Sequence, residues 1–189
     1  MAASKTFTVK YRRKKEEKTD YRKRLKLLKS EKVRIVLRVS NKNIFIQGIE
    51  FNEKGDKIIA QTNSIELKKY GWNVPTSNIP SSYLTGLLFS KKFKSKIKEA
   101  IIDLGMKKLA YRSRLAAGIK GISDGGIKIN YNEKISPTQE DIEGKTIAKF
   151  AQELSNDQNK YKKQFSIYLK NNIKPEELPE IFSNIKQKL

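Results

Sequence analysis

Basic side chains are the residues of this chain best suited to chemistry, and they gather in the stretch Lys10–Lys29, the basic segment. Eleven Lys or Arg and three acids fall within these residues. Lysine neutralises phosphate as a point charge, and arginine adds a planar fork of donors. The chemistry indicated is therefore the binding of a polyanion. A solvated tail, which is the ordinary meaning of a charge run, is the alternative.

Catalytic chemistry has few candidates, because the chain has no Cys and no His. Zinc fingers, thiol nucleophiles and imidazole bases are thereby excluded. A carboxylate cluster of the nuclease kind around Mg²⁺ remains conceivable, but no spacing motif joins its candidates. They are Glu66, Glu99, Asp103 and Asp124. The glycines of residues 118–126 do not follow a strand as a phosphate-cradling loop requires, and helix packing and a tight turn explain them better. We predict no catalytic residue, cofactor or metal.

Planar side chains accompany the basic ones, as in proteins that stack on unpaired bases. For two of these rings, Tyr21 and Trp72, a place in the core is the stronger expectation. No DNA-reading recognition helix is evident, so RNA is favoured over duplex DNA. The residues concerned are Tyr11, Tyr21, Trp72 and Tyr111, the last beside Arg112 and Arg114.

The basic segment divides into two parts. Residues 10–18 contain too few apolar side chains to bury anything, and we expect them to be extended until RNA orders them. Thr19 and Asp20 offer capping oxygens for a helix that follows. In that helix Tyr21, Leu25 and Leu28 share one face, which should dock on the body. The face presented to RNA would carry Arg22, Lys26 and Lys29.

Three strands at residues 33–39, 43–51 and 57–62 should follow as an antiparallel meander, with a bulge at Gly48. Arg38 lies before the first turn, which is Ser40-Asn41-Lys42. After the meander, a short helix should begin at Ser64 and stop at Gly71.

A longer helix should begin at Ser81 or Ser82 and run to about Lys94, with a buried stripe of leucines. Gly86 inside it indicates close approach to another backbone. The apolar run 100–104 predicts a central strand covered on both faces, residues 113–122 a helix, and 127–129 a last strand. The fold class predicted is α/β, a mixed sheet with helices packed on it.

The charge divides the chain into three parts. Net charges are +9 for residues 1–29, +11 for 30–129 and +1 for 130–189. We expect residues 1–29 to form a basic RNA-binding arm, 30–130 an α/β core, and 131–189 a helical C-terminal extension. The extension carries three amphipathic stretches, at 147–154, 161–169 and 178–185, and should pack on the body or on protein.

The whole chain has 189 residues and a formal charge of +21. This length suits one main domain, and so large a charge favours a polyanionic partner. No apolar run approaches a membrane span, and no signal peptide is evident, so a cytosolic place is expected.

Six collinear motifs resemble large-subunit ribosomal protein eighteen in its archaeal and eukaryotic form. They are RRKKEEKTDYRKRLKLLKS at 12–30, RVSNKNI at 38–44, GDKIIAQTNS at 55–64, YGWNVPTSNIPSSYLTGLL at 70–88, IIDLG at 101–105 and DGGIKI at 124–129. Two later stretches, at 144–154 and 175–182, continue the resemblance, which covers nearly the whole chain.

This resemblance implies a ribonuclease H-like topology and no catalytic activity. It implies binding of 5S rRNA in the central protuberance of the large ribosomal subunit, contacts with 23S rRNA, and neighbouring ribosomal proteins as partners. An extraribosomal protein that compacts RNA or DNA is the alternative. The loop at 106–114 corresponds to a basic loop of the family but is poorer in Pro and Gly.

The RNA-binding residues expected from the resemblance and from the basic and planar patterns together form one set. They are Lys10, Tyr11, Arg12, Arg13, Lys14, Lys15, Thr19, Tyr21, Arg22, Arg24, Lys26, Arg38, Ser40, Asn41, Lys42, Arg112 and Arg114.

Overall fold

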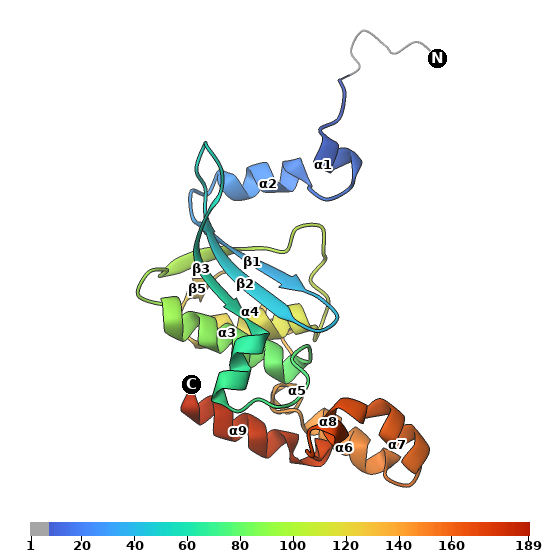
Figure 1. Ribbon diagram of the computed structural model, residues 1–189. Helices are drawn as coiled ribbons and strands as arrows, with labels where there is room; N and C mark the ends of the chain where they lie inside the picture. Colours follow the sequence, from blue (N-terminus) through green and yellow to red (C-terminus); the bar gives the residue numbers. More distant parts are fainter. Residues whose placement is uncertain (1–7) are drawn as a thin grey trace, which may run out of the picture.

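A five-stranded mixed sheet lies at the centre of the computed structural model, which describes residues 8–189 (Figure 1). The strand order is β3-β2-β1-β4-β5, with β1, β2 and β3 antiparallel and β4 parallel to both β1 and β5. The α/β class and the three-strand meander are confirmed. Residues 1–7 of the expected arm lie outside the described residues. The strands are β1 (Val33–Val39), β2 (Ile44–Glu50), β3 (Lys57–Asn63), β4 (Glu99–Asp103) and β5 (Lys128–Ile129).

The turn between β1 and β2 is closed by a serine. The Ser40 backbone N–H donates to the Asn43 carbonyl at 2.8 Å, and the Ser40 hydroxyl accepts from the Asn43 N–H at 2.9 Å. Between β2 and β3 the register shifts at Gly48 and Ile49, so the predicted irregularity is at the predicted place. A β-carbon on Gly48 would lie 2.7 Å from Ile97 Cδ1 and 3.2 Å from the Ala60 β-carbon, so a side chain there would have to displace these core neighbours.

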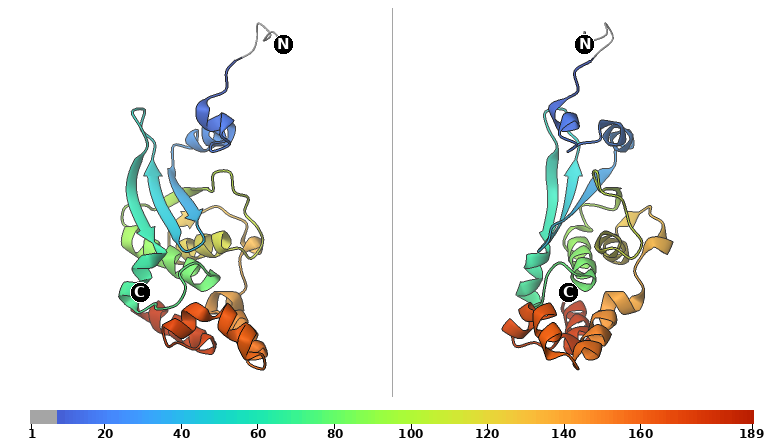
Figure 2. Two further views of the ribbon diagram at one scale, coloured as in Figure 1. Left: turned by 45° about the vertical axis from the view of Figure 1, so that its right-hand side comes forward. Right: turned by 90° about the vertical axis from the view of Figure 1, so that its right-hand side faces the viewer.

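Two helices, α3 (Ile79–Phe93) and α4 (Arg114–Asp124), cover the same side of the sheet (Figure 2). Ile35 and Leu37 of β1 alternate with residues on the other face and join Phe89 and Ile119 in the core. The predicted burial of β4 on both faces is wrong in part, because Ile101 and Ile102 are only half-buried.

Glycines let α3 and α4 approach each other closely. A β-carbon on Gly86 would lie 2.3 Å from the Gly118 carbonyl oxygen, and one on Gly121 would lie 2.1 Å from the Tyr83 carbonyl oxygen. Both distances are far below contact, so no larger residue fits without moving a helix. The close approach predicted at Gly86 is confirmed.

The first predicted helix, η1 (Ser64–Tyr70), begins at Ser64 and stops at Gly71 as expected, and it is a 3₁₀ helix. Its cap is the Asn63 side chain, because the Ser64 hydroxyl is buried and accepts from the Ile44 N–H at 3.0 Å. The predicted start of the next helix is wrong. Helix α3 begins before Ser81, with the Asn78 side chain as its cap. Proline is tolerated in the first turn of a helix, where its missing N–H has no intrahelical acceptor.

A second core joins α3 to the C-terminal helices, which pack on the body as expected. The Tyr83 and Phe182 ring centroids lie 6.0 Å apart, and Leu84 and the fully buried Trp72 belong to the same core as residues of these helices. Helix α3 is therefore buried from both sides. The C-terminal elements are η2 (Glu133–Ile135), α5 (Gln139–Glu143), α6 (Lys145–Leu154), α7 (Gln158–Gln164), α8 (Ser166–Lys170), η3 (Pro175–Glu177) and α9 (Leu178–Lys188). The single helix expected at 161–169 is divided at Phe165.

The basic segment lies at the opposite end of the sheet from the C-terminal helices (Figure 1). It forms the short α1 (Arg12–Lys15) and then α2 (Tyr21–Leu28). The predicted extended conformation is therefore wrong for residues 12–15, which make a helical turn. Neither helix contains a buried residue, so both stand on the surface of the body.

Candidate nucleic-acid interface

Helix α2 begins where the sequence predicts. The Asp20 carboxylate accepts hydrogen bonds from the Arg22 and Lys23 backbone N–H groups, each at 3.0 Å. These contacts satisfy donors that have no partner within the helix. Thr19 has another role, because its hydroxyl accepts from Arg13 Nε at 2.9 Å. This bond ties α1 to the start of α2.

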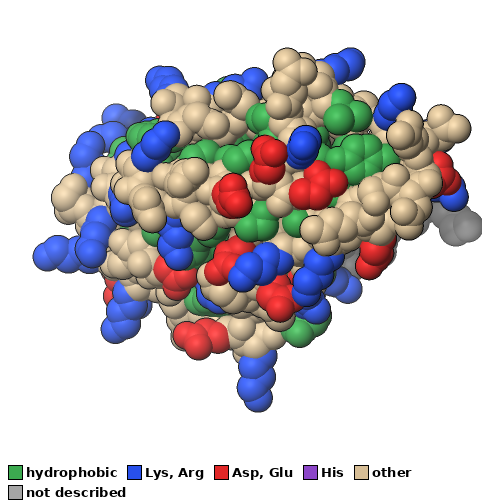
Figure 3. All heavy atoms as spheres, turned by 90° about the horizontal axis from the view of Figure 1, so that it is seen from below, with side chains coloured by type: hydrophobic (Ala, Val, Ile, Leu, Met, Phe, Trp, Pro, Cys, Tyr) green, Lys and Arg blue, Asp and Glu red, His purple; other side chains and the backbone are tan. Residues whose placement is uncertain are grey.

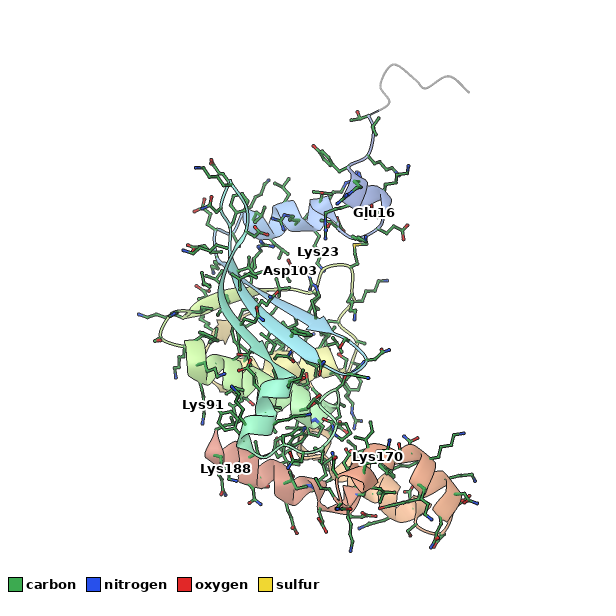
Figure 4. The ribbon with its side chains drawn as sticks, in the orientation of Figure 1. Glu16, Lys23, Lys91, Asp103, Lys170 and Lys188 are labelled. Carbon is green, nitrogen blue, oxygen red and sulfur yellow. The ribbon has the colours of Figure 1, made fainter. Side chains whose placement is uncertain are left out.

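Polar side chains hold α2 on the body, whereas its apolar stripe was expected to do so. Lys23 Nζ donates to the Gly105 carbonyl at 2.9 Å, beside Asp103 at the end of β4 (Figure 4). Arg24 donates to both carboxylate oxygens of Asp56, at 2.8 and 3.0 Å. Leu25, in the expected docking stripe, is 57% exposed. The prediction of apolar docking is wrong, because the end of the sheet offers carboxylate and carbonyl oxygens.

The outward side of the basic segment is exposed and cationic. Tyr11 lies with its ring centroid 5.1 Å from that of Tyr21, and 70% of Tyr11 is exposed. An exposed aromatic pair among cations is suited to stacking on a base. A surface cleft of about 560 Å³ opens there. Its lining includes Lys10, Lys14, Glu17, Thr19, Asp20, Tyr21, Arg22 and Met106.

A second, smaller cleft lies between the basic segment and the end of the sheet. Its volume is about 120 Å³, and it brings together Arg13, Thr19, Arg24 and Arg38 of the predicted set. The Arg38 guanidinium donates to the carbonyl oxygens of Leu37 and Asp103, yet 45% of its side chain remains exposed. It can therefore meet a phosphate without leaving its place.

The β1–β2 turn exposes Asn41 and Lys42. Lys42 is held from behind, because its carbonyl accepts from the Thr76 hydroxyl at 2.8 Å. The Ser40 hydroxyl is engaged within the turn. Asn41 and Lys42 are thus the two residues of the predicted turn whose side chains face outward for contact.

Arg112 and Arg114 have partners inside the chain. Arg112 donates through Nε and its terminal nitrogen to the two carboxylate oxygens of Asp141, at 2.7 and 2.8 Å. Arg114 donates to the Ser77 carbonyl at 3.0 Å, next to the β1–β2 turn. Both arginines therefore already have intramolecular partners, although 42% of the Arg112 side chain remains exposed.

Asp141 is a buried junction between the loop after β4 and the C-terminal helices. Its exposed fraction is 6%. Burial raises the pKa of its carboxyl group, but hydrogen bonds from Thr146, Thr138 and Arg112 outweigh burial and hold the pKa below its ordinary value of 3.8. The carboxylate is consequently charged in the folded protein, and it fixes Arg112 in place.

Replacing Asp141 with asparagine should lower the free energy of unfolding at pH 7 by about 2 kcal/mol, because a buried carboxylate that pairs with Arg112 and accepts from two threonines loses its charge. The lowered pKa means that this stability is complete above pH 3.8 and is lost as the pH falls through the folded value. Urea unfolding at pH 7 and at decreasing pH measures both effects. Glu140→Gln, which removes an exposed carboxylate, is the control and should have little effect. Equal losses for both variants would contradict the assignment.

The two candidate aromatic residues outside the basic segment differ in burial. Trp72 is fully buried, and its Nε1 donates to the Pro75 carbonyl at 3.2 Å. It belongs to the core, as the stronger expectation had it. Tyr111 is 66% exposed and is the one that can reach a base.

The four candidate carboxylates of the nuclease alternative do not meet. Each has its own structural partner: Lys92 for Glu66, Lys32 for Glu99, Arg34 for Asp103 and Tyr83 for Asp124. In residues 8–189, no group of three or more acidic side chains is arranged to hold a metal ion. Within the same residues, no helix has the length and apolar character to cross a membrane.

Sequence reasoning missed the residues that connect the basic segment to the sheet. Arg34 is 2% exposed and lies between two carboxylates, with its terminal nitrogens 2.8 Å from Asp56 and 3.1 Å from Asp103. One signal was present in the sequence: an arginine within a β-branched strand must be buried beside acids or point to solvent. Lys23 gave no such signal, because its acceptor is a backbone carbonyl.

The cationic surface and the α/β sheet define the class as a nucleic-acid-binding protein of structural type. Comparison with known proteins gives the family. Residues 5–100 match the model of "Ribosomal large subunit proteins 60S L5, and 50S L18". The chain is 41% identical over 190 residues to large ribosomal subunit protein uL18 of Korarchaeum cryptofilum (strain OPF8), covering 100% of this chain and 97% of that protein.

A second relative agrees. The chain is 40% identical over 190 residues to large ribosomal subunit protein uL18 of Methanococcus maripaludis, covering 100% of this chain and 98% of that protein. The chain therefore belongs to this family of large-subunit ribosomal proteins. It is a structural protein of the ribosome and not an enzyme, and its partners are rRNA and other ribosomal proteins.

Proposed function

We propose that this ribosomal protein binds 5S rRNA and anchors it to 23S rRNA in the central protuberance of the large subunit. The observation that carries the proposal is the exposed cationic surface of α1 and α2. Within residues 8–189, several exposed cations of this surface have no acidic side chain within ion-pair distance, whereas Arg12, Lys18 and Arg24 each have one. The cations without an acidic partner in this part of the chain are Lys10, Lys14, Lys15, Arg22 and Lys26.

The proposed division of labour follows the charge. Residues 1–29 act as the RNA-binding arm, 30–130 as the α/β core that sets its orientation, and 131–189 as a C-terminal helical extension that meets neighbouring proteins. Seen from the end that carries the C-terminal helices, acidic and basic side chains are interspersed with hydrophobic ones (Figure 3). This mixture is better suited to a protein partner than to a phosphate backbone. The strand order supports the proposed ribonuclease H-like topology.

The proposed contacts comprise the whole predicted set of RNA-binding residues, and its members have different roles. The exposed cations of α1 and α2, together with Lys42 at the β1–β2 turn, would neutralise phosphates. Arg38 would add a contact from the body, as would Tyr111, an exposed ring outside the predicted set. Arg24, Arg112 and Arg114 would support these contacts, since each already has an intramolecular partner.

A salt titration with two RNAs tests the proposal. If about six phosphates are neutralised, the logarithm of affinity for 5S rRNA should fall with the logarithm of salt at a slope of roughly −4 to −5. An unrelated structured RNA of equal length should bind much more weakly. Equal affinities for the two RNAs would favour the compaction alternative, and a flat salt dependence would exclude an electrostatic interface.

A further inference from the structure

The basic segment is joined to the sheet through a chain of charges. Arg24 of α2 contacts Asp56, which lies just before β3, and Asp56 also contacts Arg34 of β1. Arg34 then contacts Asp103 at the end of β4. Positive and negative side chains thus alternate along this series of contacts, from the surface helix to the sheet.

Arg34 fixes the geometry of this chain. Its exposed fraction of 2% and its place in a central strand leave the guanidinium little freedom. One of its terminal nitrogens lies 2.8 Å from Asp56 Oδ2, and Arg24 meets both oxygens of the same carboxylate with two hydrogen bonds. Both hydrogen bonds come from one terminal nitrogen of Arg24, so they fix the position of that nitrogen against the two carboxylate oxygens.

Few other contacts hold α2. Lys23 Nζ donates to the Gly105 carbonyl at 2.9 Å, and Gly105 is itself held by its N–H donating to Asp103 Oδ1 at 2.8 Å. No residue of α2 is buried. Its orientation therefore depends on polar contacts, and both lead to the carboxylates that Arg34 binds.

We propose that Asp56, held by buried Arg34, is a positioning residue that fixes the direction in which α2 meets RNA. The inference rests on the proposed binding of RNA by the basic segment. Asp56 would not touch RNA. Because Asp56 holds α2 in place before RNA binds, α2 would lose less conformational freedom on binding. In this way a negatively charged residue would strengthen the binding of a polyanion.

Asp56→Asn separates this positioning role from simple electrostatics, because the two predict opposite changes in RNA affinity. The variant has one negative charge fewer, so charge alone would strengthen RNA binding. Loss of the ion pair with Arg24 should instead weaken binding about fivefold, since a loose helix must be ordered on the RNA. Arg34 keeps Asp103 as a partner, so the body should remain folded.

Glu53→Gln is the matched control, because it removes the same charge from the same β2–β3 turn. Glu53 is exposed, and its replacement should leave 5S rRNA affinity equal or slightly higher. Hydrogen exchange of the free protein supplies a second readout. The amides of α2 should exchange faster in Asp56→Asn, while those of β1 and α3 remain as in the unmodified chain.

Arg24→Lys covers the case in which Asp56→Asn does not fold. It preserves the charge, but the lysine side chain is one bond shorter, so its nitrogen falls short of the place where the arginine nitrogen meets both Asp56 oxygens. Helix α2 should therefore again exchange faster, and RNA affinity should fall. Unchanged exchange in α2, or equal affinities for Asp56→Asn and Glu53→Gln, would overturn the inference. Failure of the proposed function looks different, because removing the outward cations of α1 would then leave 5S rRNA affinity unchanged.

Discussion

Replacing Arg12, Arg13, Lys14 and Lys15 together with alanine is expected to weaken 5S rRNA binding about a hundredfold at about 0.15 M salt. The salt slope should become shallower by about 3, since each lost phosphate contact removes about 0.7 from it. The fold should be preserved, because α1 contains no buried residue. Filter binding or fluorescence anisotropy over a salt series measures both quantities, and circular dichroism checks the fold.

A matched variant removes the same number of charges from the other end of the molecule. Lys162, Lys163, Lys170 and Lys174 are exposed residues of the C-terminal helices and their linkers. If net charge alone governed binding, replacing these four with alanine would weaken it as much as the change in α1. We expect the loss to be less than about threefold, because screening limits the reach of exposed charges to about 10 Å. Equal losses would show that the chain binds RNA without a defined face.

The sequence predicted the basic segment well where local rules apply. The Asp20 cap is read from residue type and position alone, and the exposed stripe of Arg22 and Lys26 follows from a period of 3.6. The docking of α2 could not be predicted in this way. Amphipathic period identifies an apolar stripe, but it does not show whether an apolar surface is available to receive it.

The acidic partners of Arg24 and Arg112 could not be predicted from local sequence rules either. Arg24 and Asp56 are 32 residues apart, and Arg112 and Asp141 are 29 apart. Such pairs form only when the fold brings distant segments together. A count of charges in the sequence therefore cannot show that these arginines already have acidic partners. Trp72 illustrates the converse. Its size alone predicts a place in the core, but the sequence did not show that residues of the distant C-terminal helices would complete that core.

Replacing Gly121 with alanine is expected to destabilise the protein by about 3 kcal/mol, which is a large share of a typical stability. The new β-carbon would lie 2.1 Å from the Tyr83 carbonyl oxygen, so α3 and α4 would have to separate. Both cores would be disturbed, because α3 lies between the sheet and the C-terminal helices. The higher helix propensity of alanine offsets only about 1 kcal/mol of this clash. Urea unfolding followed by circular dichroism measures the loss.

The cost at Gly121 is one of packing, and Gly71→Ala shows this by contrast. Gly71 ends η1 with a φ of 97°, and within residues 8–189 no atom beyond its two chain neighbours lies within 4 Å of its would-be β-carbon. Alanine there meets only the strain of the left-handed conformation, about 1 kcal/mol. Gly121 lies within a helix and has no such strain, so the two variants separate backbone conformation from contact. If Gly121→Ala were as mild as Gly71→Ala, the two helices would be able to separate cheaply. The close packing of α3 against α4 would then not be what holds the two cores together.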